Sequence, residues 1–246
     1  MTTAVVLAAG RGTRMGTLTA ATPKALLRVG GRPIIEHVLS GFAAAGVRHA
    51  VVVTGYLGAA IEAALGTGAQ LGLEIAYRRQ LHADGTARAL LLAEPLLGRD
   101  PFALSWGDIL VAAPFYAEFV AAFARRPCDA QIAVNEVDDP WRGAAVYADA
   151  DGRVHRLVEK PPRGRSRTRW NNAGVLMLGP VVFDYTRRVG RSARGEYELP
   201  QAIAEMVRDG RDVRAVPVHG PWSDIGTPED LAAAQALFAA IREGAR

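Results

Sequence analysis

The stretch between residues 4 and 32 constrains the fold and the chemistry of this chain more than any other. An apolar run at residues 4–8 leads directly into a glycine-rich turn at residues 10–16. Glycines in such a turn let backbone N–H groups approach an anion closely. No acidic residue precedes Glu36, whereas the same stretch contains the basic residues Arg11, Arg14, Lys24, Arg28 and Arg32. The pattern predicts a strand that ends at a site for adjacent negative charges, such as those of a nucleoside triphosphate.

The composition is typical of a globular protein with a full hydrophobic core. Of the 246 residues, 50% are hydrophobic, so a core can form without disulfides or structural metals. The single cysteine, Cys128, excludes an intrachain disulfide and a cysteine-cluster zinc site, and it fits a reducing, cytoplasmic location. No apolar stretch approaches the ~18 residues that a membrane span needs, and the N-terminus lacks a signal-peptide pattern. We therefore expect no membrane insertion.

The net charge of +4 comes from one short segment. The chain has 29 basic and 25 acidic residues, and residues 163–169 alone contain four arginines, Arg163, Arg165, Arg167 and Arg169. These arginines lie in one loop sequence rather than along a helix face, and no aromatic platform accompanies them. We therefore expect no nucleic-acid binding. The segment is either a solvated loop or a mobile loop that meets a phosphorylated substrate.

Apolar runs and amphipathic stretches alternate through the first half of the chain. The runs that predict strands are residues 3–8, 49–54, 73–77, 102–106 and 130–137. The stretches that predict helices are residues 33–45, 57–65, 85–94 and 114–125. The alternation predicts a Rossmann-like α/β fold with three layers, in which helices cover a doubly wound, mainly parallel but mixed sheet. Ligands of such sheets bind beyond the carboxyl ends of the strands, where both Gly10 and the Gly107-Asp108 pair lie.

The second half is less regular and is expected to form a substrate-binding segment inserted into the sheet. The turn at residues 149–152 predicts a hairpin between two strands. Those hairpin strands and the further strands are expected at residues 143–149, 153–158, 173–179 and 213–218. Helices are expected at residues 197–209 and from Thr227 onwards, because Thr227 can cap a helix that has Pro228 in its first turn.

The glycine-rich turn differs from two common phosphate-binding motifs. Gly16 falls outside the glycine spacing of the dinucleotide fingerprint, which argues against a nicotinamide-dependent dehydrogenase. No Gly-Lys-Ser/Thr sequence closes the turn, so it is not a Walker A loop.

Seven ordered motifs extend from residue 4 to about residue 232. The first is Leu7-Ala8-Ala9-Gly10-x-Gly12-Thr13-Arg14-Met15, followed by Pro23-Lys24. The others are Gln80 with Asp84-Gly85-Thr86-Ala87, Gly107-Asp108, Val158-Glu159-Lys160-Pro161, Asn172-Ala173-Gly174, Arg194-Gly195-Glu196, and the run from Trp222 to Asp230. In this order they resemble the sugar-1-phosphate nucleotidyltransferases, also called nucleotide-sugar pyrophosphorylases, in their short single-domain form.

The resemblance implies an enzyme that transfers a nucleotidyl group from a nucleoside triphosphate to a sugar 1-phosphate and releases pyrophosphate. The attacking phosphate is already ionised, so charge neutralisation and in-line positioning are the main tasks. It also implies a single domain that comprises residues 1–246. Residues 1–137 would mainly bind the nucleotide, residues 138–228 would mainly bind the sugar phosphate, and residues 229–246 would form a C-terminal helix. The implied nucleotide-binding residues are Leu7, Ala8, Ala9, Gly10, Gly12, Thr13, Arg14, Gln80, Gly85 and Thr86.

The resemblance also implies a catalytic set that comprises Arg14, Lys24, Asp108 and Lys160. Asp108 and Asp224 would hold Mg²⁺, an ion that prefers one or two carboxylates together with phosphates and water. Arg14 would bind the β- and γ-phosphates and Lys24 the α-phosphate.

The implied sugar-phosphate-binding residues are Gly143, Glu159, Lys160, Asn172, Arg194 and Trp222. Glu159 would accept hydrogen bonds from sugar hydroxyls, while Lys160 and Arg194 would bind the phosphate. Trp222 could stack on a sugar face or belong to the core.

Gln80 favours UTP or dTTP, because its amide offers a donor and an acceptor to the edge of uracil or thymine. Asp84 stands where many relatives have an apolar residue, which is a departure in this base pocket. The alternatives are a GTP-dependent mannose- or heptose-1-phosphate guanylyltransferase and a catalytically silent module of the same fold that binds nucleotide sugars. The sugar and the oligomeric state, including a homo-oligomer, stay open.

Overall fold

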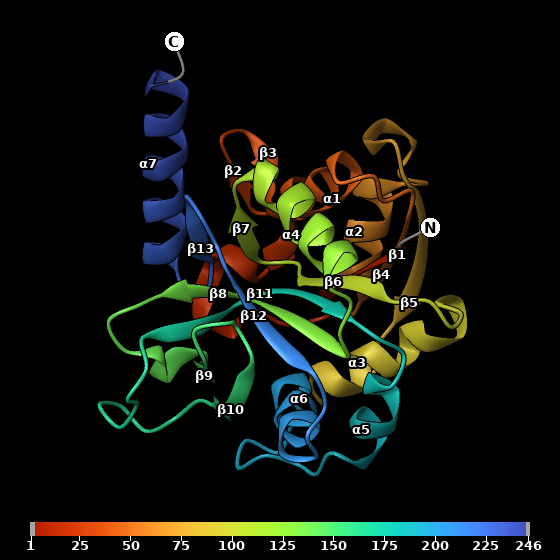
Figure 1. Ribbon diagram of the computed structural model, residues 1–246. Coiled ribbons are helices and arrows are strands. Elements are labelled where there is room, and N and C mark those ends of the chain that lie inside the picture. The colour runs from red at the N-terminus through yellow and green to blue at the C-terminus, as the bar shows by residue number, and fades with distance from the viewer. Residues whose placement is uncertain (1–2, 245–246) are drawn as a thin grey trace.

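The computed structural model describes the backbone of residues 3–244 and the side chains up to residue 239. Within these residues one nine-stranded mixed sheet has the order β10-β9-β11-β6-β1-β4-β5, with β8 beside β11 and β12 beside β8 (Figure 1). Its strands are β1 (Thr3–Ala8), β4 (His49–Thr54), β5 (Glu74–Arg79), β6 (Phe102–Trp106), β8 (Ala130–Glu136), β9 (Ala144–Ala148), β10 (Val154–Glu159), β11 (Trp170–Leu178) and β12 (Val213–Pro217). Two separate ribbons comprise β2 (Arg28–Val29) with β3 (Arg32–Pro33), and β7 (Ile109–Val111) with β13 (Trp222–Asp224).

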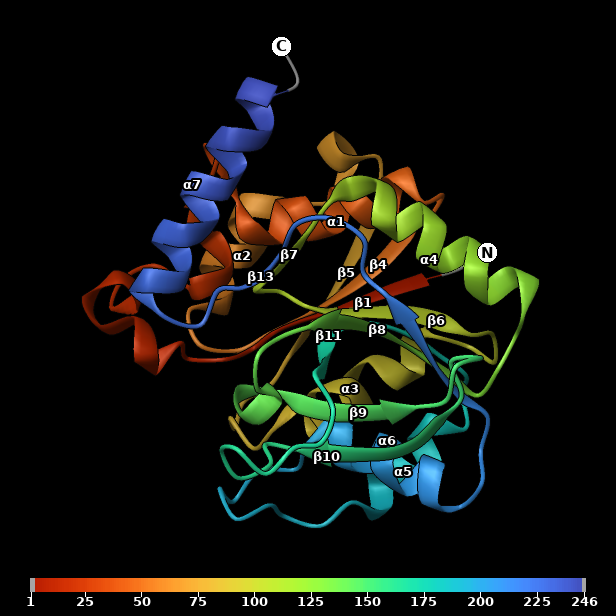
Figure 2. The ribbon, with the colours of Figure 1, turned by 60° about the vertical axis from the view of Figure 1, so that its left-hand side comes forward.

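Helices cover both faces of the sheet and give the three layers expected from the sequence (Figure 1, Figure 2). One face carries α1 (Ile34–Ala44), α2 (Gly58–Leu65) and α4 (Ala113–Arg125). The other carries α3 (Thr86–Ala93), α5 (Val182–Arg188) and α6 (Leu199–Arg208). The last helix, α7 (Pro228–Gly244), contacts β2 and β13 and extends away from the body of the molecule (Figure 2). Short 3-10 helices are η1 (Thr13–Thr19), η2 (Lys24–Leu26), η3 (Ala69–Leu71), η4 (Glu94–Leu96) and η5 (Pro140–Arg142).

The first half of the sheet is parallel, as its strand–helix alternation predicts. β1 pairs in parallel with β4 on one side and with β6 on the other, so that Val5 lies opposite both Val51 and Leu104. Parallel strands buried on both faces need nearly continuous apolar sequence, and β1 is buried from its second residue onwards. This pairing brings the carboxyl ends of β1, β4, β5 and β6 to one edge, directly before the glycine-rich turn.

The second half introduces the antiparallel pairs that make the sheet mixed. β11 runs antiparallel to β6, β8 and β9, and the expected hairpin forms between β9 and β10. β11 begins at Trp170, three residues before the expected strand, because Trp170 and Asn172 pair with the end of β8. The sequence did not predict α5, the β2–β3 and β7–β13 ribbons or the 3-10 helices, which are short and lack a clear period. Apart from the start of β11, the ends of the predicted strands and helices lie within about two residues of their expected positions.

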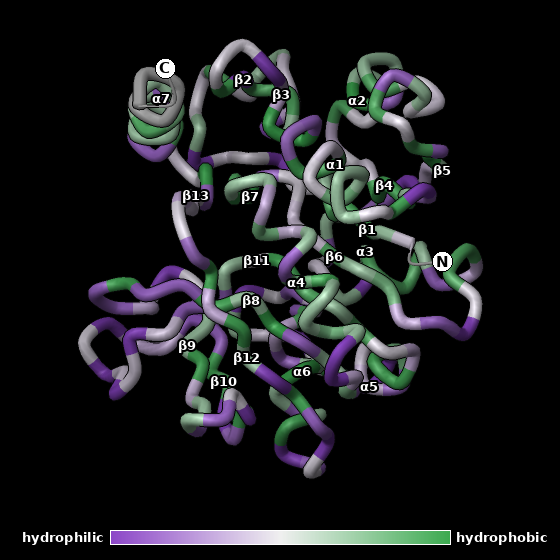
Figure 3. The backbone as a smooth tube through the Cα atoms, turned by 45° about the horizontal axis from the view of Figure 1, so that its top comes forward, coloured by the Kyte–Doolittle hydropathy of each residue, from purple (hydrophilic) through white to green (hydrophobic). Residues whose placement is uncertain are grey.

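The apolar segments lie mainly in the central strands, and hydrophilic loops surround them (Figure 3). Two large clusters of buried side chains fill the spaces between the sheet and its two helical layers. In one of them α1 packs on α4 at Gly41, where an added Cβ would lie 2.3 Å from Cδ2 of Tyr116. Tyr116 is 1% exposed and its ring meets Phe42 edge-on, so the two helices approach closely only because Gly41 has no side chain.

None of the helices in residues 3–244 combines the length and the apolar character that a membrane crossing requires.

We predict that Gly41→Ala lowers the free energy of unfolding by about 1–3 kcal/mol, because the new methyl group overpacks the ring of Tyr116. Gly190→Ala is the matched control, since a Cβ at Gly190 has no neighbour within 4 Å. Urea unfolding followed by circular dichroism measures both. A Gly41→Ala protein as stable as the control would show that helix packing tolerates the methyl group and would contradict the prediction.

Candidate active site

A cavity of about 1090 Å³ lies at the carboxyl edge of the parallel strands. It is lined by the glycine-rich turn, by the ends of β4, β5 and β6, and by residues 80–86. The cavity brings together all ten residues expected to bind a nucleotide: Leu7, Ala8, Ala9, Gly10, Gly12, Thr13, Arg14, Gln80, Gly85 and Thr86. Lys24 and Asp108, expected from separate motifs, line it as well.

The glycine-rich turn has a geometry that other residues would strain. Gly12 has a φ of 64°, and a Cβ there would lie 3.2 Å from Cβ of Lys24. The hydroxyl of Thr19 donates a hydrogen bond to the Gly12 carbonyl at 3.0 Å, which fixes the turn. The guanidinium of Arg14 packs over Gly226, where a Cβ would lie 3.2 Å from its Nη2. Arg14 therefore reaches across the cavity towards the segment that follows β13.

Asp108 and Asp224 lie side by side because β7 pairs with β13. Asp224 pairs with Ile109, and the N–H of Ile225 donates to the carbonyl of Asp108 at 3.1 Å. Lys24 forms an ion pair with the Asp108 carboxylate. Partial desolvation, and then the nearby charge of Asp108, raise the pKa of Asp224 to about 6. The sequence placed these two carboxylates in separate motifs, and the ribbon joins them.

The carboxylate pair fits a divalent cation that is shared with phosphates. No group of three or more His, Cys, Asp or Glu side chains that could hold a metal occurs within the described part of the chain. Mg²⁺ does not need such a group, because it is usually bound by one or two carboxylates plus substrate phosphates and water. The mutual repulsion that raises the pKa of Asp224 would be relieved by a cation between Asp108 and Asp224.

Gln80 lies in the cavity wall with its amide fixed by its neighbours. Its Nε2 donates to Oδ1 of Asp84 at 2.7 Å and to the carbonyl of Gly85 at 3.0 Å. Both N–H groups of the amide are therefore occupied, and the carbonyl oxygen is left as the hydrogen-bonding group of Gln80. This differs from our expectation that the amide offers a donor and an acceptor. Asp84, the departure noted in the sequence, is the residue that turns the NH₂ group inward.

The residues expected to bind a sugar phosphate form a second cluster, at the end of β10. Glu159 lies 3.8 Å from Nζ of Lys160 and 3.9 Å from Nη2 of Arg194. Lys160 has a φ of 43°, a conformation that is costly for a residue with a side chain. Its N–H donates to the carbonyl of Gly143 at 2.8 Å, so the strained residue is held in place.

The remaining members of this set have structural contacts. A Cβ at Gly143 would lie 2.2 Å from Oδ1 of Asn171, so a larger residue there would displace the Asn171 side chain. Asn172 Oδ1 accepts a hydrogen bond from the N–H of Gly174 at 3.0 Å. Trp222 donates its Nε1–H to the carbonyl of Ala173 at 2.8 Å and packs against the core. Of the two interpretations of Trp222, the packing favours that of a core residue.

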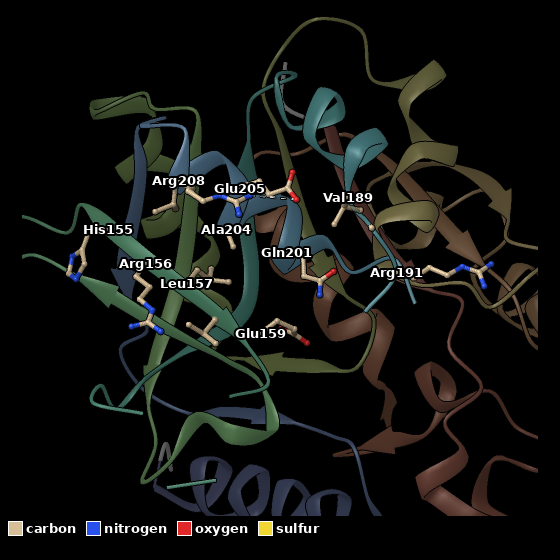
Figure 4. Close-up of a pocket in the computed structure, with 13 residues that line it drawn as sticks. His155, Arg156, Leu157, Glu159, Val189, Arg191, Gln201, Ala204, Glu205 and Arg208 are labelled. Atoms are coloured by element: carbon tan, nitrogen blue, oxygen red, sulfur yellow. Dashed lines mark ion pairs between the residues drawn. The ribbon is translucent and has the colours of Figure 1, made fainter. Parts of the chain in front are cut away.

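Glu159 is a largely buried carboxyl with a raised pKa. Its side chain is 13% exposed. Burial, and then the neighbouring Glu198 carboxylate, raise the pKa of Glu159 to about 8, against the opposing effect of Lys160 and Arg194. Both effects favour the protonated form of Glu159. Glu159 also borders a smaller cavity of about 560 Å³ between β10 and α6, into which Gln201 and Glu205 of α6 project (Figure 4).

Several residues of the two clusters were missed by the sequence analysis. Tyr56 and Arg79 line the large cavity, at or just beyond the ends of β4 and β5, and that position was the signal available for them. Glu196 also lines it. Of the arginine-rich loop, Arg163 stacks on the exposed Trp141 and Arg169 pairs with Asp138 at 3.4 Å. Neither contact distinguishes a solvated loop from one that meets a substrate.

Comparisons with known proteins agree with this geometry. A family model described as nucleotidyl transferase matches residues 3–240. The chain is 34% identical to a glucose-1-phosphate thymidylyltransferase of Streptomyces antibioticus, over 93% of the chain and 64% of that protein. It is 35% identical to the UTP–glucose-1-phosphate uridylyltransferase AglF of Haloferax volcanii, over 92% of both chains. A provisionally assigned glucose-1-phosphate thymidylyltransferase from Bacillus anthracis, solved in complex with sucrose, superposes with a TM-score of 0.88 at 28% identity, covering 97% of this chain and 95% of that one.

The chain spans slightly less than two thirds of the Streptomyces protein, so that protein contains sequence with no counterpart here. The Haloferax protein is matched over nearly all of its length.

We expect the wild-type protein to lose stability as the pH rises from about 4.5 to 8, because Glu159 ionises in this range. We predict that Glu159→Gln loses less stability over the same range. A carboxyl whose pKa is raised on folding stabilises the native state fully below its unfolded pKa, and this contribution is lost as the pH rises through the folded value. For one proton the slope is at most about 1.4 kcal/mol per pH unit. Urea midpoints at several pH values measure the effect, with Glu205→Gln on α6 as the control. Identical pH profiles for wild type and Glu159→Gln would contradict the assignment.

Proposed function

Because the chain belongs to the nucleotidyl transferase family, we propose that it transfers a nucleotidyl group from a nucleoside triphosphate to a sugar 1-phosphate. The observation that carries the proposal is the pair of adjoining clusters. One is a glycine-lined cavity with Arg14, Lys24 and Asp108, and the other contains Lys160 and Arg194 beside the buried carboxyl of Glu159. Two polyanionic substrates need two adjacent cationic sites, and this arrangement supplies both.

In the proposed reaction a phosphate oxygen of the sugar 1-phosphate attacks the α-phosphorus of the triphosphate. The bond from the α-phosphorus to the bridging oxygen of the β-phosphate breaks, and pyrophosphate leaves with that electron pair. The attacking oxygen is already ionised, so no side chain has to remove a proton. The protein's contribution is to hold the two anions in line and to offset their charge.

The cations divide this task in the proposal. Arg14 reaches over Gly226 and would hold the β- and γ-phosphates as they become the leaving group. Lys24, whose side chain is 14% exposed, would contact the α-phosphate from its position beside Asp108. Charge-assisted contacts of this kind contribute roughly 1.5–3 kcal/mol each. Lys160 and Arg194 would bind the phosphate of the sugar.

We further propose Mg²⁺ as the cofactor, held by Asp108 and Asp224 together with phosphate oxygens. When bound there, the ion would neutralise charge on the triphosphate and the leaving pyrophosphate.

The fixed amide of Gln80 supports a base with a ring N–H next to a keto oxygen. The Gln80 carbonyl can accept that N–H. The N–H of Gly85, which has no acceptor among the described residues, can donate to the keto oxygen. Uracil and thymine present this pair at N3 and O4, so UTP and dTTP are the proposed substrates. Guanine presents the same pair at N1 and O6, which makes GTP the alternative, whereas cytosine has no N–H at N3.

The catalytically silent module is less well supported. A protein that only binds a nucleotide sugar has no need for Lys24 and Arg14 beside two adjacent carboxylates. The proposed assay measures pyrophosphate release with UTP, dTTP, GTP, CTP or ATP against a panel of sugar 1-phosphates, starting with glucose 1-phosphate. Absence of release with every pair would reject the enzyme and leave the silent module.

We predict that Asp108→Asn lowers turnover by roughly 100-fold or more, because it removes charge from the proposed metal site and leaves Lys24 without its partner. The fold should survive, since an amide has nearly the shape of a carboxylate. Pyrophosphate release and thermal melting measure the two effects, with the exposed Asp100→Asn as the control. Turnover near the wild-type level would exclude Asp108 from the site, and activity unaffected by EDTA would exclude Mg²⁺.

We predict that Asp84→Ala lowers the preference for UTP over CTP by about tenfold, in line with the free energy of a hydrogen bond to a charged group. Without Oδ1 of Asp84, the Gln80 amide can rotate and donate to N3 of cytosine. The ratio of kcat/KM values for UTP and CTP measures the change, and Asp100→Ala is the control. An unchanged ratio would show that Asp84 does not set the orientation of Gln80.

A further inference from the structure

Glu198 is a buried carboxylate to which the proposed reaction gives no role. It immediately precedes α6 and is 4% exposed. A side chain at this position normally caps the helix, but that of Glu198 makes no hydrogen bond to the first turn of α6. A buried carboxylate is costly unless it is paired, so its contacts indicate what it does.

The first contact of Glu198 is a two-point pair with Arg194. Nη2 of Arg194 lies 2.7 Å from Oε2 of Glu198, and its Nε donates to Oε1 at 3.2 Å. Bidentate pairs fix the plane of a guanidinium as well as its place. The remaining amino group, Nη1, has no partner within the described residues, and the Arg194 side chain is 45% exposed. Glu198 thus fixes one edge of Arg194 and leaves another edge available.

Glu198 also acts on Glu159, because burial first and the Glu198 carboxylate second raise the pKa of Glu159. Both carboxyls lie beside the Arg194 guanidinium, whose Nη2 is 2.7 Å from Glu198 and 3.9 Å from Glu159. With Glu159 protonated, Lys160 and Arg194 balance the charges of Glu196 and Glu198. With Glu159 ionised, the same five groups have a net negative charge, which opposes the binding of a phosphate. Glu198, whose charge raises the pKa of Glu159, therefore favours the state of the cluster that can bind an anion.

The backbone on both sides of Glu198 is attached to the nucleotide cavity. The N–H of Tyr197 donates to the carbonyl of Asp84 at 2.8 Å, and the N–H of Ala87 donates to the carbonyl of Tyr197 at 2.9 Å. On the other side, the N–H of Leu199 donates to the hydroxyl of Thr86 at 2.9 Å. Glu198 is thereby held at a fixed place relative to residues 84–87.

We propose that Glu198 is a positioning residue for the second substrate. It holds the guanidinium of Arg194 and the carboxyl of Glu159, so that Nη1 of Arg194 meets the phosphate of a sugar 1-phosphate in one orientation. The inference rests on the proposed function, because it assigns that phosphate to Arg194. It adds that the orientation is set from residues 84–87, the first three of which line the nucleotide cavity.

The kinetic test compares Glu198→Gln with wild type. We expect the KM for glucose 1-phosphate, or for the sugar 1-phosphate that the panel identifies, to rise about tenfold or more, since the guanidinium loses its charged partner. The KM for the nucleoside triphosphate should change less than about twofold. Glu198→Asp, which keeps the charge, should restore part of the affinity. Glu205→Gln is the matched control, because Glu205 lies on α6 itself and its carboxylate pairs, among the described residues, only with Arg208, at 3.7 Å.

Two kinetic results would overturn the proposal. One is a KM for the sugar phosphate that stays within twofold of wild type. The other is an equal rise in both KM values, which is the result expected if Glu198 only supports the fold.

A measurement without turnover separates this inference from the proposed function. In ¹⁵N-labelled protein, the Nε–H signal of Arg194, identified by its loss in Arg194→Lys, should exchange slowly in wild type and fast in Glu198→Gln. Slow exchange in both proteins would overturn the proposal even if the enzyme is active. If no sugar phosphate reacts, the proposed function fails. Exchange that is slow in wild type and fast in Glu198→Gln would still support the pairing of Arg194 with Glu198.

Discussion

The close approach of two backbone segments at Gly85 and Tyr197 is the constraint on which both halves of the site depend. Gly85 has a φ of 115°, and a Cβ there would lie 2.3 Å from the carbonyl oxygen of Tyr197. Only glycine allows this contact, through which Asp84 and Ala87 hydrogen-bond to Tyr197. The cavity that starts at the glycine-rich turn and the cluster around Arg194 are therefore joined by backbone hydrogen bonds rather than by flexible side chains. For a reaction between two bound anions, this rigidity sets the distance between them.

A second constraint is electrostatic. The site concentrates cations for its substrates, and two of them have a close carboxylate partner: Asp108 for the largely buried Lys24, and Glu198 for the half-exposed Arg194. Such pairs reduce the cost of burying charge before a substrate arrives. They also leave surplus carboxylates at Asp224 and Glu159, whose pKa values are raised by burial first and by a neighbouring carboxylate second. In the proposal, a cation relieves the first surplus and a proton relieves the second.

The sequence predicted the parallel half of the fold well, because buried strands and amphipathic helices alternate there with clear turns between them. The ten residues that it predicted to bind a nucleotide also lie together in the cavity wall, since they belong to short motifs. It did not predict the β7–β13 ribbon that places Asp224 beside Asp108, because three-residue strands have no period to detect. It missed Glu198 for a related reason. A glutamate before a helix is common, and only the fold shows that its side chain contacts Arg194 and not the helix.

Gln80 shows most clearly how a motif can be identified while its chemistry is misjudged. The residue type suggested an amide with a donor and an acceptor to offer, and spacing placed it correctly in the cavity wall. The orientation depends on a neighbour four residues later, Asp84, whose carboxylate accepts one of the N–H groups. A carboxylate can only accept at neutral pH, so it fixes which end of the amide is left for a ligand. The Asp84 carboxylate, together with the carbonyl of Gly85, therefore determines the hydrogen-bonding pattern of the Gln80 amide in the cavity wall.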